Sequence, residues 1–276
     1  MTQQGEASEH SADSPHEPRS PHEPQPPQQS PSPQQPPSSR PENDAEPPRT
    51  HRWGFGAFLF VEAVFVLSAV FISVLIDGRR HPIALTLVGT IVPAVLAAGV
   101  AMLITTLRGN GPVKDLRIGF TREDFRVGMK FGVIGLICTT VAAVIWTRVV
   151  GEENATSALG SLVTDERLPV FAVVVMFLYV WLIGPVCEEI IYRGLLWGAL
   201  ERLRWGRWTV LLLSTAVFAV SHLEPWRTSL LLVIGLPIGL ARMYTGRLGS
   251  SVIAHQANNF LPALTYLLTA LGVMAT

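Results

Sequence analysis

Two adjacent acids, Glu188 and Glu189, stand in an otherwise apolar stretch of this 276-residue sequence. An ionised carboxylate inside a membrane span costs several kcal/mol unless it is paired or protonated, so an acid in such a place is functional by default. Two histidines, His222 and His255, occur in two later apolar segments, and Asn259 follows His255 by one helical turn. These groups on three apolar segments predict acid–base chemistry on a water molecule inside the membrane.

The helical spacing gives the two glutamates different roles. Glu189 and Arg193 are four residues apart with the acid first, which is the favourable order for an ion pair on a helix, and a guanidinium matches a carboxylate well. Glu188 lies about 100° around the helix and has Tyr192, an uncharged hydrogen-bond donor, four residues later. We therefore predict that Arg193 neutralises Glu189 and that Glu188 is the free general base. The alternative is that both acids only hold helices together.

His255 and Asn259 share one face of a helix, where an imidazole and a carboxamide together can donate two hydrogen bonds to a developing oxyanion. Asn258, three residues after His255, competes for this role. The alternative for all of them is hydrogen bonding between helices. His222, at the end of an apolar segment, taken alone is consistent with a simple polar contact, and its assignment to a site depends on the other groups.

Glu188, His222 and His255 also form a candidate zinc site, which would hold a metal-activated water. The sequence contains no His-Glu-x-x-His helix, so these ligands would have to come from three separate spans. A divalent metal such as zinc therefore stays an open alternative, and no nucleotide site is predicted. A further acid, Glu62, lies in the first apolar segment; we expect it to contact a neighbouring helix, with a role in the site as the alternative.

The elements that must position these groups are membrane helices. Charged residues make up 15% of the chain, against about 25% in a soluble domain. Residues 1–50 differ because they hold 13 of the 21 prolines and no aromatic residue, and they cannot bury enough apolar surface to fold. We predict a disordered, Pro-rich cytoplasmic tail over residues 1–50, either a plain spacer or the binding site of a partner. Residues 51–276 are predicted to form an all-α, polytopic membrane helix bundle.

About 20 apolar residues are needed to cross the hydrocarbon core of a membrane, and about seven or eight segments meet this length or approach it. Their approximate limits are 54–76, 82–107, 127–150, 168–203, 208–222, 228–244, 248–261 and 262–274. The 168–203 segment is longer than one straight crossing, and we expect Gly184-Pro185 to break it. The last two segments are short, and we expect half-length or irregular pieces that line a cavity.

The distribution of Lys and Arg predicts the orientation of the bundle. Basic residues gather between residues 108 and 130, just after residue 201, and between 242 and 247, so these loops and the tail are predicted to be cytoplasmic. The net charge is zero, which gives no support for nucleic-acid binding. Glycine pairs four residues apart are predicted to let helices approach closely; they are Gly128/Gly132, Gly194/Gly198 and Gly235/Gly239.

Helical rise leaves one inconsistency in this arrangement. Glu188 and His222 lie about 20–25 Å from the basic turn that joins their segments, whereas His255 lies only about 10 Å past the next basic turn. The sequence therefore predicts either a broken or re-entrant segment or span limits that differ from those above.

Three short motifs carry a family resemblance. Glu188-Glu189-Ile-Ile-Tyr-Arg193, Phe218-Ala-Val-Ser-His222 and His255-Gln-Ala-Asn-Asn259 resemble the Glu-Glu-three-Arg, Phe-three-His and His-three-Asn motifs of the CPBP family, which comprises CAAX proteases and bacteriocin-processing enzymes. Each motif alone is weak, but all three occur in order in consecutive apolar segments. The resemblance covers about residues 168–261, the predicted catalytic core.

The resemblance implies an all-α membrane bundle around a water-filled cavity, and intramembrane peptide hydrolysis as the activity. The motif residues would then share one site: Glu188 activating the water with His222, His255 and Asn259 stabilising the oxyanion, and Glu189 and Arg193 in support. The implied substrate is a membrane-associated or lipidated protein or peptide, with prenylation left open, and the implied location is the cytoplasmic membrane of a prokaryote. The competing functions are a non-catalytic membrane immunity or scaffold protein and a proton-coupled transporter.

Overall fold

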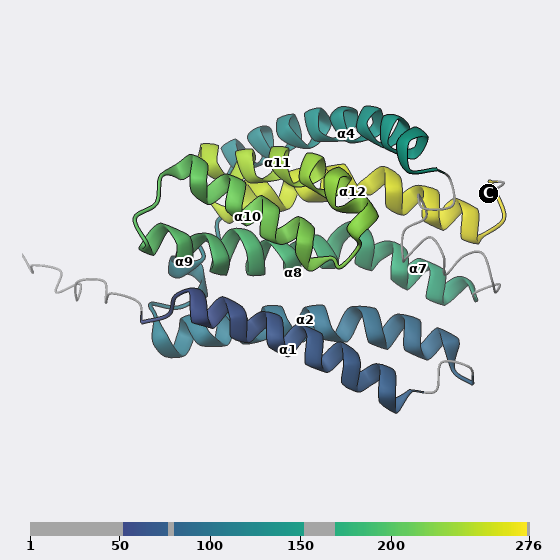
Figure 1. Cartoon of the computed structure of the whole chain (residues 1–276), viewed down its shortest axis with the longest axis horizontal. Helices are drawn as coiled ribbons and strands as arrows, with labels where there is room; N and C mark the ends of the chain where they lie inside the picture. The colour runs from purple at the N-terminus through teal and green to yellow at the C-terminus, as the bar shows by residue number, and fades with distance from the viewer. Residues whose placement is uncertain (1–51, 77–79, 152–168, 275–276) are drawn as a thin grey trace, which may run out of the picture. The chain divides into compact units, whose positions relative to one another are not determined.

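The computed structural model describes residues 52–76, 80–151 and 169–274, which form helices and the turns between them. The predicted tail and most of the polar loop after residue 150 lie outside the described residues. The helices follow one another without a strand in these ranges (Figure 1): α1 (Phe55–Leu75), α2 (Pro82–Arg108), α3 (Pro112–Asp115), α4 (Arg122–Val150), α7 (Val170–Leu178), the π-helical η1 (Tyr179–Ile183), α8 (Gly184–Glu189), the π-helical η2 (Ile190–Leu196), α9 (Trp197–Arg202), α10 (Arg207–Ser221), the short turn η3 (Pro225–Arg227), α11 (Thr228–Thr245) and α12 (Leu248–Ala270).

Five helices of the described part are long and apolar enough to cross a membrane. They are α1, α2, α4, the continuous Val170–Arg202 run, and the Pro225–Thr245 run that contains α11. The helix α10 is apolar but shorter, and α12 carries the polar residues of the third motif. The prediction of an all-α membrane helix bundle is confirmed.

The Val170–Arg202 run is one continuous helix, so the predicted break at Gly184-Pro185 is wrong. Pro185 has no N–H and would leave the preceding turn of a regular α-helix without a donor. The chain instead widens into a π-helical turn, η1, just before it, where the Gly184 N–H donates to the Tyr179 carbonyl. A second π-helical segment, η2, follows Glu189. Such segments within α-helices are rare and often lie at functional sites.

The helix α12 is likewise a single element of 23 residues, and the predicted split at Pro262 is wrong. Proline within a membrane helix is tolerated where neighbouring helices support it. Here the part of α12 after Pro262 packs on α7, where Tyr266 clusters with Val173 and Met176. The helix therefore continues past the proline instead of ending as a half-length segment.

The helix α4 starts earlier than the predicted span because its first turn is capped. The Thr121 hydroxyl accepts from the Asp124 N–H, and the Asp124 carboxylate accepts from the Thr121 N–H, which is a capping box. The Arg247 Nε–H donates to the same carboxylate, with distances of 3.0 Å and 2.9 Å to its two oxygens. These bonds tie the turn between α11 and α12 to α4, and so fix where α12 begins.

Figure 1 shows α4 running along α11 and α12. Glycine residues of α4 allow it to pack closely on α12. A Cβ placed on Gly128 would come 2.7 Å from the Ile253 Cβ, and one placed on Gly132 would come 2.6 Å from the Ala257 Cβ. Real Cβ atoms essentially never approach so closely. This predicted glycine pair therefore lies at a helix–helix contact.

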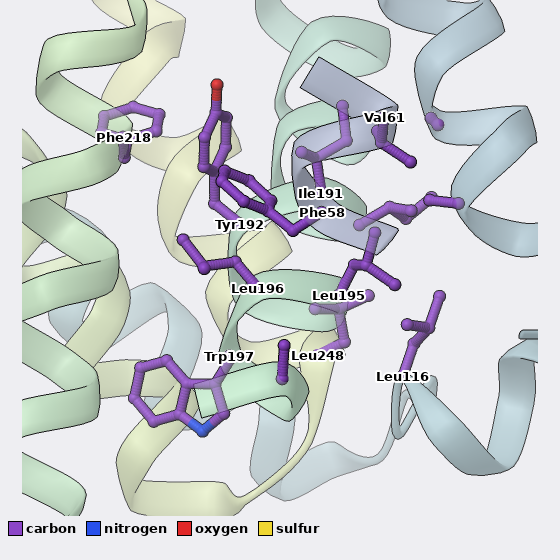
Figure 2. Packing of buried hydrophobic residues seen from close by; sticks show 14 of the residues in the cluster. Phe58, Val61, Leu116, Ile191, Tyr192, Leu195, Leu196, Trp197, Phe218 and Leu248 are labelled. Carbon is purple, nitrogen blue, oxygen red and sulfur yellow. The ribbon is translucent and has the colours of Figure 1, made fainter. Parts of the chain in front are cut away.

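The largest apolar cluster surrounds η2, every residue of which is buried. Figure 2 shows Tyr192 of η2 between Phe58 of α1 and Phe218 of α10. The ring centroids of Phe58 and Tyr192 are 6.1 Å apart, and those of Tyr192 and Phe218 are 5.4 Å apart. Such aromatic pairs add about 0.5–1.5 kcal/mol each beyond the effect of their buried area. The cluster thus holds α1 and α10 against the helix that carries the two glutamates.

Candidate active site

Glu189 is fully buried and its charge is compensated, as the spacing predicts. Its Oε1 atom lies 3.2 Å from Nη1 of Arg193, which is also fully buried. The Arg193 Nη2 atom donates to the Gly235 carbonyl of α11 at 3.1 Å, and the guanidinium lies over the Phe218 ring, 4.4 Å from its centroid. The ion pair is therefore held between its own helix, α10 and α11.

His255 of α12 joins the same pair. Its Nδ1–H donates to Glu189 Oε1 at 2.9 Å, because a carboxylate paired with arginine can only accept. This bond orients the ring so that its other nitrogen, Nε2, lies 3.7 Å from Glu188 Oε2. That separation is too long for a hydrogen bond. His255 therefore contacts both glutamates while bonding only one of them.

Glu188 has a different environment from its neighbour. Its side chain is 30% exposed, whereas that of Glu189 is 0% exposed. The two side chains point about 100° apart around the helix, so Glu188 is turned away from Arg193. Within the described part of the chain, its one ion-pair contact is the 3.7 Å approach of His255. The Glu188 carboxylate therefore keeps lone pairs that can take a proton from water.

His222 follows the last residue of α10 and contacts the same phenyl ring as His255. Its Nδ1–H donates to the Phe218 carbonyl at 2.7 Å, because a carbonyl oxygen can only accept, and Nε2 is left to accept a proton. The Phe218 ring centroid lies 4.7 Å from that of His222 and 5.9 Å from that of His255. Both predicted histidines thus contact one phenyl ring. Phe218 is the first residue of the second motif, and its spacing of four residues from His222 is a signal for such a contact.

The two asparagines of α12 that compete for the oxyanion role face different neighbouring helices. Asn258 is buried and accepts from the Thr139 hydroxyl of α4 at 3.2 Å. Asn259, one turn after His255 on the same face, donates from Nδ2 to the Val180 carbonyl of η1 at 3.2 Å. A carboxamide has two N–H groups, so Asn259 keeps one for another acceptor. Asn258 also keeps its N–H groups but faces α4, whereas Asn259 faces the helix that carries the glutamates, so the placement favours Asn259 over Asn258.

Residues 170–261 match the family model described as type II CAAX prenyl endopeptidase Rce1-like. The resemblance to the CAAX proteases is confirmed. The match, called the Rce1-like segment below, runs from α7 into α12 and contains all three motifs, whereas α1, α2 and α4 lie outside it. No curated protein and no solved structure matches the chain.

Arg242 of the Rce1-like segment supports the site, although the sequence places it in a basic cytoplasmic turn. It is buried in the last turn of α11, and its Nε–H donates to the Arg193 carbonyl in η2 at 3.1 Å. This bond joins the last turn of α11 to the helix that carries the glutamates. Because α12 is one continuous helix and His255 bonds Glu189, His255 reaches the glutamates without a re-entrant segment.

The predicted zinc ligands of the Rce1-like segment do not form a metal-binding set. Among the residues that the structure describes, no three His, Cys, Asp or Glu side chains are arranged to hold a metal ion. The Nδ1 atoms of His222 and His255 donate hydrogen bonds within the protein, as in many metal-binding histidines, so the misfit lies in the placement of the side chains and not in these bonds. Glu188, His222 and His255 as placed do not fit a zinc site, and no step proposed below passes through a metal.

Proposed function

We propose that this chain is an intramembrane endopeptidase that hydrolyses a peptide bond of a membrane-associated or lipidated substrate. The observation that carries the proposal is the contrast between the two acids. Glu189 is bonded by Arg193 and His255, while Glu188 keeps a partly exposed carboxylate without a hydrogen-bonded cation in the described residues. An acid with spare lone pairs in an apolar helix suits proton transfer. The match to a type II CAAX prenyl endopeptidase family supports the same activity.

In the proposed reaction, Glu188 takes a proton from a water molecule, and His222 Nε2 accepts a second hydrogen bond that orients this water. The water oxygen attacks the carbonyl carbon of the scissile peptide and forms a tetrahedral intermediate with a negatively charged oxygen. The C–N bond then breaks, and the proton held by Glu188 passes to the leaving nitrogen. The products are a new carboxylate and a new amino terminus, and Glu188 is regenerated.

The negatively charged oxygen is assigned to His255 and Asn259. Asn259 has one N–H beyond the one bonded to Val180. His255 can donate from Nε2 when both of its ring nitrogens carry protons, and the carboxylates of Glu189 and Glu188 lie where they balance that positive charge. Donors fixed at the position where charge develops lower the barrier most in a site with little water.

The chain is an integral membrane protein, as the five long apolar helices among the described residues and the family match indicate. We propose that it lies in the cytoplasmic membrane of a prokaryote with the N-terminus in the cytoplasm, because the basic loops would then face the cytoplasm. Its partners would be membrane lipid and a peptide or lipidated protein, with the Pro-rich tail available to a further partner.

The proposal is tested by comparing protein termini in source cells that carry the wild type, Glu188→Gln or Glu201→Gln at equal expression. Glu188→Gln keeps the size of the side chain but cannot take a proton, so we expect it to abolish cleavage. Its folded yield, measured by size-exclusion chromatography, should stay normal because no buried pair is broken. Glu201→Gln is the matched control, since Glu201 lies on α9 and pairs with Arg117.

A terminus that is present with the wild type and Glu201→Gln but absent with Glu188→Gln establishes proteolysis and names a substrate. If no terminus depends on Glu188 while deletion of the whole gene still has a phenotype, the endopeptidase proposal fails. A non-catalytic scaffold or a transporter would then replace it.

A further inference from the structure

A pocket that contains none of the predicted catalytic residues lies at the start of α4. Its volume is about 740 Å³, and it is formed by the first two turns of α4, the turn before them and one residue of α12. Its lining combines two arginines with four apolar side chains, which are Arg122, Arg126, Phe120, Phe125, Met129 and Ile253. The pocket therefore offers positive charge and apolar surface to the same ligand.

The two arginines keep their positive charge available. Arg122 and Arg126 are one helical turn apart, so they share a face of α4, and both are exposed. Within the described ranges, neither of them forms an ion pair. The acids of the same turn, Glu123 and Asp124, are bound instead by Arg247, at nitrogen–oxygen distances of 2.6 Å and 2.9 Å. The pocket therefore suits an anion, and guanidinium groups match the geometry of a phosphate.

The polarity of the pocket changes along α4. Helical rise places Met129 about 10 Å further along the helix than Arg122, and Phe125 lies between them with 61% of its surface exposed. Because α4 is long and apolar enough to cross a membrane, this direction leads from the membrane surface into the hydrocarbon. A phospholipid has the same order, with a phosphate at the surface and acyl chains below it.

The helix α12 gives the pocket a defined shape. Ile253 of α12 belongs to its lining, and this residue packs so closely on α4 that a Cβ on Gly128 would come 2.7 Å from the Ile253 Cβ. Phe120 packs on the start of α12, where a Cβ on Gly249 would come 3.0 Å from its ring. The pocket is therefore built from two helices, which distinguishes it from charge spread over a surface.

We propose that this pocket binds one anionic phospholipid, with the phosphate at Arg122 and Arg126 and an acyl chain along Phe125 and Met129. The inference goes beyond the proposed function and does not depend on it. The basic segment before α4 is predicted to face the cytoplasm, so the lipid belongs to the cytoplasmic leaflet, where anionic lipids give a negative surface potential. An acidic protein segment would match the arginines but not the apolar surface that continues into the membrane.

The charge is tested by native mass spectrometry of the purified full chain, titrated with phosphatidylglycerol or phosphatidylcholine. Phosphatidylglycerol is anionic, whereas the choline of phosphatidylcholine neutralises its phosphate. Arg122→Gln/Arg126→Gln removes both cations of the pocket. The matched control, Arg204→Gln/Arg207→Gln, removes the same charge from the exposed turn between α9 and α10. We expect the pocket variant to bind phosphatidylglycerol about twentyfold to thirtyfold more weakly than the wild type, about fivefold for each arginine, and the control to bind it normally.

The pocket itself is tested by Met129→Trp, which fills it and keeps both arginines. Ile145→Trp is the control, because Ile145 is exposed on the same helix and lies about 24 Å further along it. We expect Met129→Trp to weaken phosphatidylglycerol binding at least tenfold and Ile145→Trp to leave it unchanged, with normal size-exclusion profiles for both. The inference is overturned if phosphatidylcholine binds as tightly as phosphatidylglycerol, if the two double arginine variants weaken binding equally, or if folded Met129→Trp binds like the wild type.

Discussion

The two sides of the helix that carries the paired acids differ in how deeply their carboxylates are buried and in how closely cations approach them. On the closed side, Glu189 is fully buried and bonded by Arg193 and His255. On the open side, formed by Glu188 and His222, the carboxylate is 30% exposed and 3.7 Å from the nearest histidine nitrogen with which it pairs. Two identical side chains, one residue apart, thus receive opposite environments from about 100° of helical rotation.

The difference follows from the cost of burying a charge. A fully buried carboxylate has to be matched by a cation and hydrogen bonds, and the 0% exposure of Glu189 keeps its oxygens away from water. Arg242 extends the closed side by bonding the Arg193 carbonyl. We therefore expect variants of the closed side to lower the stability of the fold, and variants of the open side to lower turnover.

The largest effect on stability is expected for Arg193→Ala, which removes the cation of the closed side. It leaves the Glu189 carboxylate buried without its cation, and removing one partner of a buried ion pair costs about 3–5 kcal/mol. We expect a low folded yield and a lower melting temperature, measured by thermal unfolding of the purified protein in detergent.

The double variant Glu189→Met/Arg193→Met is the control for this prediction, because it removes both charges and keeps apolar volume. Replacing a whole buried pair by apolar residues is often neutral for stability, so the double variant should melt at a higher temperature than Arg193→Ala. An Arg193→Ala protein that melts like the wild type would show that the pair does not stabilise the fold, and the contrast between the two sides would lose its energetic basis.

The next-largest effects are expected for the two neighbouring asparagines of α12. Asn259→Ala removes a donor assigned to the oxyanion, and loss of one such donor lowers kcat by about a hundredfold to a thousandfold. Asn258→Ala instead leaves the Thr139 hydroxyl without its acceptor, which costs about 1–3 kcal/mol of stability. Cleavage kinetics and thermal unfolding should therefore give opposite patterns for the two variants. The reverse result would assign the oxyanion to Asn258.

The closed side is the part of the site that local sequence predicts best. Glu189 and Arg193 are neighbours on any α-helix, so their spacing is enough to predict the pair. The same periodicity puts Asn259 on the face of His255, but it does not decide against Asn258. That decision depends on a hydrogen bond to Thr139, which is 119 residues away in the sequence and leaves no local signal.

The features that sequence does not predict are those that depend on such distant contacts. Gly184-Pro185 has the local pattern of a break, yet Gln256 of α12 donates to the Leu182 carbonyl in η1, so the widened turn keeps its carbonyls bonded and the helix continues. Arg242 resembles a loop cation because basic residues usually lie outside the membrane. Apolar periodicity predicts which segments cross the membrane, but it does not predict which polar groups meet between them.

The smallest effect is expected where α4 packs on α12, the helix that carries His255. A variant at this contact tests whether α4 holds α12 in the position that lets His255 bond Glu189. A Cβ on Gly132 would lie 2.6 Å from the Ala257 Cβ, so Gly132→Ala has to move the two helices apart. Overpacking of this kind costs about 1–3 kcal/mol. We expect a lower melting temperature, and a kcat per folded molecule that falls much less than in Asn259→Ala.

Gly99→Ala is the control for this prediction, because it adds the same methyl group at a position away from the contact between α4 and α12. Gly99 lies within α2, and an added Cβ would meet nothing within 4 Å, so alanine there should stabilise the helix by about 0.5–1 kcal/mol. The two glycine variants should therefore shift the melting temperature in opposite directions. If Gly132→Ala is as stable as Gly99→Ala, the added methyl group is accommodated by a shift of α4 that leaves α12 in place. The position of His255 would then be set by its bond to Glu189 and not by the packing of α12 on α4.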